Sequence, residues 1–328
     1  MKKCLVTKLN GSVDNNELLK IGEMRIKVES VESPTKSTQG FKCSFSEPTT
    51  LEIIGDGYFT DETLTANLGK SKVVSGEVEV FVSEATSISI KDKYKLSSLL
   101  LITNNIEPYG SNKVFSIDDL KYSPNLKQIE VAETQAFGDI ACFANKTALV
   151  SINMENTKLT GDIEAIKNDT ALNKLILSGT SVTGDIVNLK NLTNLTYLNL
   201  ADTQVAGDIA QLEPCSKITY LLAPNNVTGD LSKLPKECYM AKFSKTSITS
   251  FTWTSRPSSY NIFATEGKIK VDNIDKMLQD LAQCQTAYPS SGEIWYKTIN
   301  IIGTHTSASD SALLALQSKG YTVTITPA

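Results

Sequence analysis

Hydrophobic positions in the middle of the chain recur with a period of 23 residues. The clearest unit runs from Leu172 to Ile186 and reads Leu-x-x-Leu-x-Leu-x-x-Thr-x-Val-x-Gly-Asp-Ile. Side chains alternate along a strand, so the last two leucines of the first half lie on one face of a short strand. One coil cannot bury these leucines, whereas a stack of coils can. The pattern therefore predicts a solenoid of parallel strands over residues 95–270. The first leucine position recurs at Leu126, Leu149, Leu172, Leu195 and Ile218.

Two further positions of the unit, one a hydroxyl or amide residue and the other a glycine, follow the same repeat. A hydroxyl or amide follows each strand where the chain bends, and it can satisfy backbone groups left unpaired there. Stacked, these residues form a predicted structural ladder of Asn104, Thr134, Thr157, Thr180, Thr203 and Thr246. A glycine then permits a turn conformation that other residues disfavour. These predicted turn glycines are Gly138, Gly161, Gly184, Gly207 and Gly229.

These units resemble leucine-rich repeats. The segment Leu159-Thr160-Gly161-Asp162-Ile163 is similar to the Leu-x-Gly-x-Ile half of plant-type repeats. Two features depart from that family: threonine replaces the usual ladder asparagine in four coils, and the proline that often follows the isoleucine is absent. The resemblance implies the solenoid fold class but not the detailed structure of the convex side.

The two flanks have other patterns. Residues 1–94 alternate apolar and polar positions between turn signals such as Asn10-Gly11, Pro48 and Gly55-Asp56-Gly57, which predicts an all-β module. This module either caps the open end of the solenoid or attaches the protein to something else. Residues 271–328 predict α/β capping repeats: helices at 272–284 and 309–319, the second closed by Gly320, and strands at 297–302 and 321–325. The whole chain is predicted to be β-rich and α/β in part.

An acidic column follows the turn glycines. Like charges this close repel, and a bound Ca²⁺ would remove that cost. The simpler interpretation, which we favour, is that each carboxylate caps its turn or faces water. We therefore predict no metal, and the only candidate Ca²⁺ ligands are Asp139, Asp162, Asp185, Asp208 and Asp230.

The outward positions of the predicted strands form a candidate binding face. Adjacent tyrosines bordered by amides and carboxylates could bind a sugar or a protein loop through apolar area and hydrogen bonds. An ordinary mixed surface is the alternative. The binding-face candidates are Gln128, Ser151, Lys174, Tyr197, Tyr220, Asn153, Asn199, Asn156 and Asp202.

Composition narrows the function classes. A net charge of −4 argues against nucleic-acid binding through bulk charge. The single histidine, His305, argues against chemistry that needs several imidazoles, and no common catalytic or nucleotide-binding motif occurs. The six cysteines are irregularly spaced, which predicts that they are small buried hydrophobic residues rather than a disulfide framework. We predict a non-enzymatic protein with no cofactor.

No apolar stretch is long enough to span a membrane, and the start has no signal peptide, which suggests assembly inside a cell.

The two ends of the chain carry a second resemblance. Residues 1–13, with Leu18-Leu19-Lys20-Ile21-Gly22-Glu23, and residues 306–326 are similar to proteins of tailed phages of gut Bacteroidales, including crAss-like phages. This resemblance implies a virion-associated structural protein, a head or tail appendage assembled in the host cytoplasm. Its partners would be other virion proteins and a host-surface glycan.

Three functions stay open at this point. The first is a phage virion protein whose repeat face mediates protein binding or host attachment. The second is a bacterial leucine-rich-repeat interaction scaffold or surface adhesin, which a secretion signal would favour. The third is a glycan-cleaving enzyme, which needs two carboxylates in one groove.

Overall fold

The computed structural model describes much of the 328-residue chain as two compact units, residues 1–160 and 161–328. The boundary between them lies inside the predicted solenoid, and the predicted boundaries at residues 94 and 270 stay predictions. No helix among the described residues is long and apolar enough to cross a membrane. The described residues are 3–5, 18–20, 24–28, 39–54, 57–60, 71–82, 87–90, 95–102, 113–230, 233–235, 238, 240–243, 247–248, 269–271, 273–283 and 298–327.

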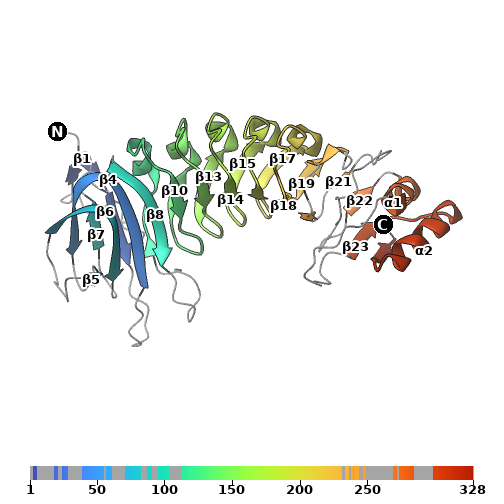
Figure 1. The fold of residues 1–328 in the computed structure, drawn as a ribbon, viewed down its shortest axis with the longest axis horizontal. Coiled ribbons are helices and arrows are strands. Elements are labelled where there is room, and N and C mark those ends of the chain that lie inside the picture. Colours follow the sequence, from blue (N-terminus) through green and yellow to red (C-terminus); the bar gives the residue numbers. More distant parts are fainter. Residues whose placement is uncertain are drawn as a thin grey trace. The chain divides into compact units, whose positions relative to one another are not determined.

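The N-terminal part of the first unit consists of antiparallel strands (Figure 1). A long strand, β4 (Gln39–Ile54), pairs with β6 (Ser71–Val82), β7 (Ser87–Ile90) and β8 (Leu96–Ile102). Pro48, expected to separate two strands, lies within β4, where the β4–β6 register shifts between Phe45 and Thr49. A proline cannot donate to the ladder, and a bulge accommodates it. Strand β1 (Lys3–Leu5) pairs with β2 (Leu18–Lys20). Strand β3 (Met24–Val28) pairs with β7 and with β9 (Lys113–Val114). Strand β5 (Gly57–Thr60) pairs with β6.

The repeat begins in the first unit with parallel strands. Strand β10 (Gln128–Glu130) pairs in parallel with β8 and with β12 (Ser151–Asn153). A second parallel pair joins β11 (Phe137–Asp139) to β13 (Lys158–Asp162). Two short 3-10 helices, η2 (Asp118–Tyr122) and η3 (Ile140–Phe143), complete these coils. The leucine positions predicted to form the core, Leu126 and Leu149, are fully buried.

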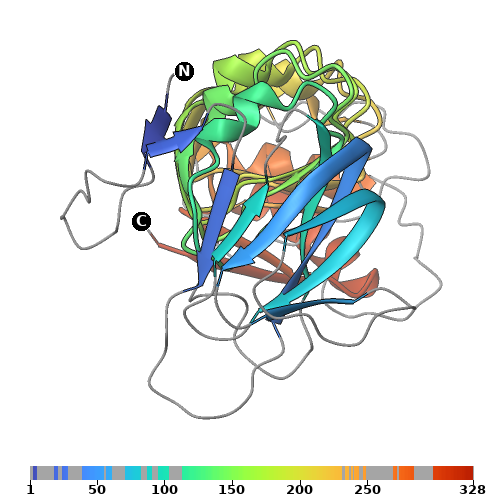
Figure 2. The ribbon, with the colours of Figure 1, turned by 90° about the vertical axis from the view of Figure 1, so that its left-hand side faces the viewer.

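The second unit repeats the same coil. Strands β14 (Lys174–Ile176), β16 (Tyr197–Asn199), β18 (Tyr220–Leu222) and β20 (Met240–Lys242) pair in parallel in that order. A second parallel ladder contains β15 (Ser181–Asp185), β17 (Gln204–Asp208) and β19 (Asn226–Thr228). The 3-10 helices η4 (Ile163–Ile166), η5 (Ile186–Leu189) and η6 (Ile209–Leu212) follow the turn glycines. Figure 1 shows these helices side by side along one edge, and Figure 2 shows the coils superposed end-on.

The leucine-rich-repeat-like solenoid is therefore present, and its leucine positions Leu172, Leu195 and Ile218 are fully buried. The second ladder was not predicted from the sequence. Its strands are short, and their outward residues are polar or small, as in Ser181-Val182-Thr183-Gly184-Asp185. They become strands because each coil supplies a neighbour for the next at hydrogen-bonding distance.

The C-terminal repeats contain the two α-helices of the described chain. Helix α1 (Ile274–Gln283) and helix α2 (Asp310–Ser318) match the predicted helices to within two residues at each end. Gly320 ends α2 with a φ of +83°, as a C-terminal cap requires. Four parallel strands form one sheet in the order β21 (Ser247–Ile248), β22 (Ile269–Val271), β23 (Thr298–Ile302) and β24 (Thr322–Thr326).

Candidate binding surface on the repeat strands

The predicted columns of the binding face lie in register. In the first unit, Gln128 is paired with Ser151. In the second unit, Lys174 is paired with Tyr197, Tyr197 with Tyr220, and Tyr220 with Met240. Parallel strands stand roughly 4.8 Å apart, so residues 23 positions apart in sequence become direct neighbours.

The two tyrosines form a stacked pair. The ring centroids of Tyr197 and Tyr220 are 4.2 Å apart and the ring planes differ by 11°. Both side chains are half-buried. Each ring covers one face of the other, so the pair presents an apolar edge with two phenolic hydroxyls. A paired aromatic of this kind is rigid and loses little conformational entropy when a partner binds it.

Two of the predicted binding residues serve the fold instead. Asn199 is buried; its Nδ2 donates to Ser178 Oγ at 2.9 Å and its Oδ1 accepts from the Ala201 N–H at 3.1 Å. Ser151 is also buried, and its hydroxyl donates to Glu130 Oε1 at 2.9 Å. Neither candidate is therefore exposed on the face, because both side chains are buried and their polar atoms bond within the repeat.

The other polar candidates lie at the border of the face. Asn153 is half-buried, and its Oδ1 accepts from the Glu155 N–H at 3.3 Å. Asn156 is exposed and donates to Glu133 Oε1 at 2.6 Å. Asp202 is exposed and accepts from Asn225 Nδ2 at 3.1 Å. Gln128 donates to Glu130 Oε1 at 3.0 Å. These groups therefore form short polar links within and between successive coils.

The border column has an unusual backbone. Glu133, Asn156, Gly179 and Asp202 adopt left-handed conformations, with φ of 58°, 50°, 67° and 54°. They are spaced 23 residues apart; glycine, asparagine and aspartate are the types that tolerate this conformation, and Glu133 is the exception. Sequence reasoning placed Asn156 and Asp202 beside the face without predicting their backbone conformation. The left-handed residue turns the chain off the strand just before the threonine.

The threonine column completes that turn. The hydroxyls of Thr134, Thr157, Thr180 and Thr203 donate to the carbonyl three residues earlier at 2.6–2.8 Å. All four side chains are buried. These hydroxyls satisfy backbone carbonyls in the bend, and each bond lies within one coil rather than between coils. The ladder residues Asn104 and Thr246 lie outside the described residues.

The acidic column caps the 3-10 helices. In four coils the aspartate Oδ1 accepts the backbone N–H two residues later, at 2.8–2.9 Å. These aspartates are Asp139, Asp162, Asp185 and Asp208. Asp118, which sequence reasoning missed, starts this column: its Oδ1 accepts the Asp139 N–H at 2.9 Å. Asp230 is half-buried and its carbonyl accepts from Lys233. Within the described residues no group of three or more acidic, histidine or cysteine side chains is arranged to hold a metal.

The turn glycines make room for this column. A Cβ on Gly138, Gly184, Gly207 or Gly229 would stand 1.9–2.6 Å from the carboxylate of the preceding coil. All four have φ between +106° and +143°, and Gly161 has φ of +99°. The positive φ favours glycine at all five turns, and the close approach of the carboxylate is a second reason at four of them.

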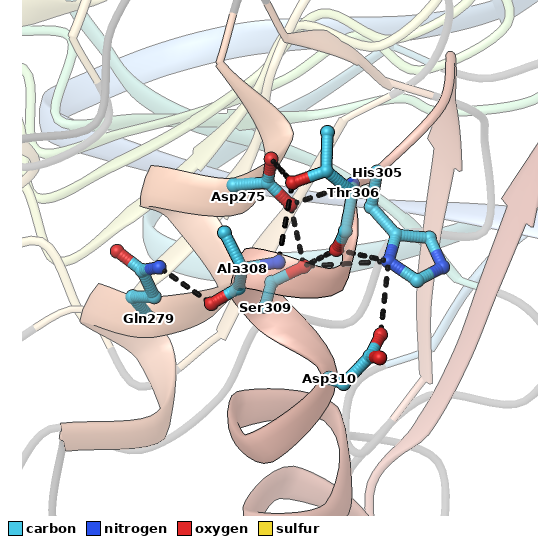
Figure 3. Close-up of polar contacts among 7 residues, drawn as sticks. All are labelled: Asp275, Gln279, His305, Thr306, Ala308, Ser309 and Asp310. Carbon is cyan, nitrogen blue, oxygen red and sulfur yellow. Dashed lines mark hydrogen bonds and ion pairs between the residues drawn. The ribbon is translucent and has the colours of Figure 1, made fainter.

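His305 lies in a polar cluster that sequence reasoning did not find (Figure 3). Asp275 accepts from the Thr306 N–H, the Thr306 hydroxyl and the Ser309 hydroxyl at 2.6–2.9 Å. These bonds, with the charge of His305 as a smaller cause, lower the pKa of Asp275. The His305 Nδ1 lies 3.3 Å from Ser309 Oγ and 3.8 Å from Asp310 Oδ1. A Ser-His-Asp triad needs serine and carboxylate on opposite ring nitrogens. This cluster instead joins α1 to the start of α2.

Comparison with known proteins gives only distant likenesses. No protein-family model and no curated protein matches the chain. Among solved structures, it is similar to the leucine-rich-repeat ectodomain of the Arabidopsis thaliana receptor kinase GASSHO1/SCHENGEN3, with 15% identity and a TM-score of 0.41 over 71% of this chain and 38% of that one. It is also similar to a plant ice-binding protein, with 18% identity and a TM-score of 0.40 over 58% and 61%. The chain thus spans less than two thirds of either protein. The repeat assignment therefore rests on this chain's own period and strand register.

Proposed function

We propose that this chain is a non-enzymatic binding scaffold whose repeat strands hold a protein or glycan ligand at the Tyr197–Tyr220 pair. The observation that carries the proposal is this stacked pair on a regular parallel sheet. In a typical interface a few residues carry most of the binding energy, and tyrosine is enriched among them. Lys174 is in register beside Tyr197 and contributes a charged group to the same column.

The roles of the polar residues support binding rather than catalysis. The carboxylates of Asp139, Asp162, Asp185 and Asp208 cap 3-10 helices, and Asp275 joins two helices. A glycosidase needs two carboxyl groups that face a sugar from opposite sides. In the second unit the outward positions of β14, β16 and β18 are Lys174, Ile176, Tyr197, Asn199, Tyr220 and Leu222, and the carboxylate of Asp202 lies at the border of this face.

We further propose that the scaffold belongs to a virion, as a head or tail appendage of a tailed phage that infects gut Bacteroidales. This part rests on the resemblance of residues 1–13 and 306–326. Its ligand would then be a neighbouring virion protein or a glycan of the host surface. The alternative is a bacterial leucine-rich-repeat scaffold or surface adhesin with the same binding face.

Binding measurements with paired variants test the scaffold. Tyr197→Ala with Tyr220→Ala should abolish binding to host-surface polysaccharide or to disassembled particle proteins, measured by biolayer interferometry. The matched control is Lys158→Ala with Gln204→Ala, because these exposed residues lie on the second ladder. Equal binding by both double variants would contradict the proposed face, and loss of polysaccharide on incubation would favour an enzyme.

Mass spectrometry of gradient-purified phage particles tests the location. Tens of copies per particle would support a virion component. Absence from particles, with the chain found in the bacterial envelope or cytoplasm, would overturn the virion proposal and favour the bacterial scaffold.

A further inference from the structure

Strand β24 is an edge strand. It pairs in parallel with β23 along its full length, from Thr298–Thr322 to Ile302–Thr326. Among the described strands it has a partner on this side only, because it ends the order β21-β22-β23-β24. An open edge presents a row of backbone donors and acceptors that can pair with another strand.

The direction of these backbone groups follows from one hydrogen bond. The Gly303 N–H donates to the Thr326 carbonyl at 2.8 Å, so the main chain of Thr326 faces β23. Main-chain groups of successive strand residues point to opposite sides. Thr322 and Thr324 therefore also bond toward β23. The N–H and C=O groups of Val323 and Ile325 point to the open edge.

The described residues of β24 include none of the usual sequence devices against edge pairing. Natural edge strands carry lysine, proline, a bulge or an inward-facing charge. β24 reads Thr-Val-Thr-Ile-Thr, five β-branched residues that favour extended structure. Pro327 follows the strand and has no N–H, so it limits any added ladder to residues 322–326.

The strand is also nearly self-complementary. Read in reverse it is Thr-Ile-Thr-Val-Thr, so an antiparallel copy centred on Thr324 places Val323 opposite Ile325 and Thr322 opposite Thr326. The outward groups of Val323 and Ile325 then exchange two hydrogen bonds at each of two sites, as an antiparallel pair requires. Threonine meets threonine on one face, and aliphatic side chains meet on the other, both of which are favourable cross-strand pairs.

The exposure of the side chains fits this arrangement. Thr322 and Thr324 are exposed, whereas Val323 and Ile325 are half-buried on the strand's other face. We propose that β24 pairs antiparallel with β24 of a second copy of this chain, about a two-fold axis at Thr324. The two four-stranded sheets then become one continuous sheet. Such an isologous contact closes as a dimer.

The contact is small, so the dimer should dissociate on dilution. Five strand residues bury less surface than a standard stable interface. We expect sedimentation velocity to show the chain at 35.7 kDa when dilute and at twice that mass at high micromolar concentration. A chain that stays at the monomer mass throughout this range overturns the proposal, as does growth beyond a dimer.

A proline substitution can block pairing at the open edge of β24 while the sheet itself stays intact. Ile325→Pro removes an N–H that faces the open edge and leaves the bonds to β23 in place, so it should keep the chain monomeric. Ile325→Val retains the N–H and is the matched control that should still dimerise. Circular dichroism verifies that both variants are folded. If a folded Ile325→Pro variant dimerises at the concentration at which the wild-type chain does, the proposal is contradicted.

A cysteine scan tests the register without relying on proline. At the two-fold axis the two copies of residue 324 form a non-hydrogen-bonded pair with Cα atoms about 4.5 Å apart, which suits a disulfide. The two copies of residue 322 lie about 13 Å apart in the same dimer. Thr324→Cys should therefore give a covalent dimer on mild oxidation, whereas Thr322→Cys should form no more covalent dimer than the wild-type chain. Equal cross-linking by both overturns the assigned register.

Discussion

Gly184 lies directly against the carboxylate of Asp162 from the preceding coil. A Cβ added to Gly184 would stand 2.2 Å from Asp162 Oδ1, and that same oxygen accepts the Glu164 N–H at 2.8 Å. The Gly-Asp motif therefore acts across two coils: the aspartate caps its own 3-10 helix, and the glycine of the next coil leaves space for it. This explains why the two residues recur together.

Replacing that glycine should strongly destabilise the second unit. Gly184→Ala places a methyl group against Asp162 at a φ of +112°, so we expect a loss of about 2–4 kcal/mol from strain and overpacking. Gly76→Ala is the control, because Gly76 has φ of +71° with open space around it, and should cost about 1 kcal/mol. Urea denaturation followed by circular dichroism measures both. Similar losses in the two variants would show that the close approach is unimportant.

The aspartate column should contribute through capping and not through a metal. Asp185→Ala removes the acceptor for the Val187 N–H and should cost about 1 kcal/mol. Thermal unfolding in the presence of Ca²⁺ or of a chelator should give the same melting temperature for the wild-type chain. A rise of several degrees with Ca²⁺ that disappears in Asp185→Ala would instead establish a cation site.

Threonine should be required in the bend for its hydroxyl. Thr180→Val keeps the shape but leaves the Leu177 carbonyl without the donor it has at 2.6 Å, so we expect a loss of about 1–2 kcal/mol. Thr180→Ser keeps the hydroxyl and removes only a methyl group. Chemical denaturation should therefore rank serine above valine in stability. The opposite order would mean that packing, not the hydrogen bond, selects threonine.

The Asp275 cluster should make the C-terminal repeats sensitive to acid. Its hydrogen bonds to Ser309 and Thr306 lower the pKa of Asp275 in the folded chain. A lowered folded pKa adds stability at pH values above the unfolded pKa of about 3.9, and this is lost as pH falls through the folded pKa. Asp275→Asn should therefore lower the melting temperature at pH 7 and make little difference at the lowest pH. A pH-independent gap between variant and wild type would contradict this assignment.

Much of the architecture could be predicted because burial in a stacked coil requires periodic residues. Leu172, Leu175 and Leu177 are fully buried, as their spacing indicates. The same 23-residue period correctly predicts that Tyr197 aligns with Tyr220, since residues one coil apart must become neighbours. Helices α1 and α2 were predicted from apolar spacing and a terminal glycine, which are local signals.

The sequence by itself thus determined the coil, its core and the register of its strands, because these depend on spacing along the chain. Only the tertiary structure decided which polar groups of the strand face stay exposed. Asn199 and Ser151 occupy outward strand positions, yet both are buried and donate hydrogen bonds to side chains of the preceding coil. Asp118 and Asp275 meet partners 21 and 31 residues away in sequence, outside the 23-residue spacing. Such pairings depend on how loops of unequal length pack, which no local pattern records.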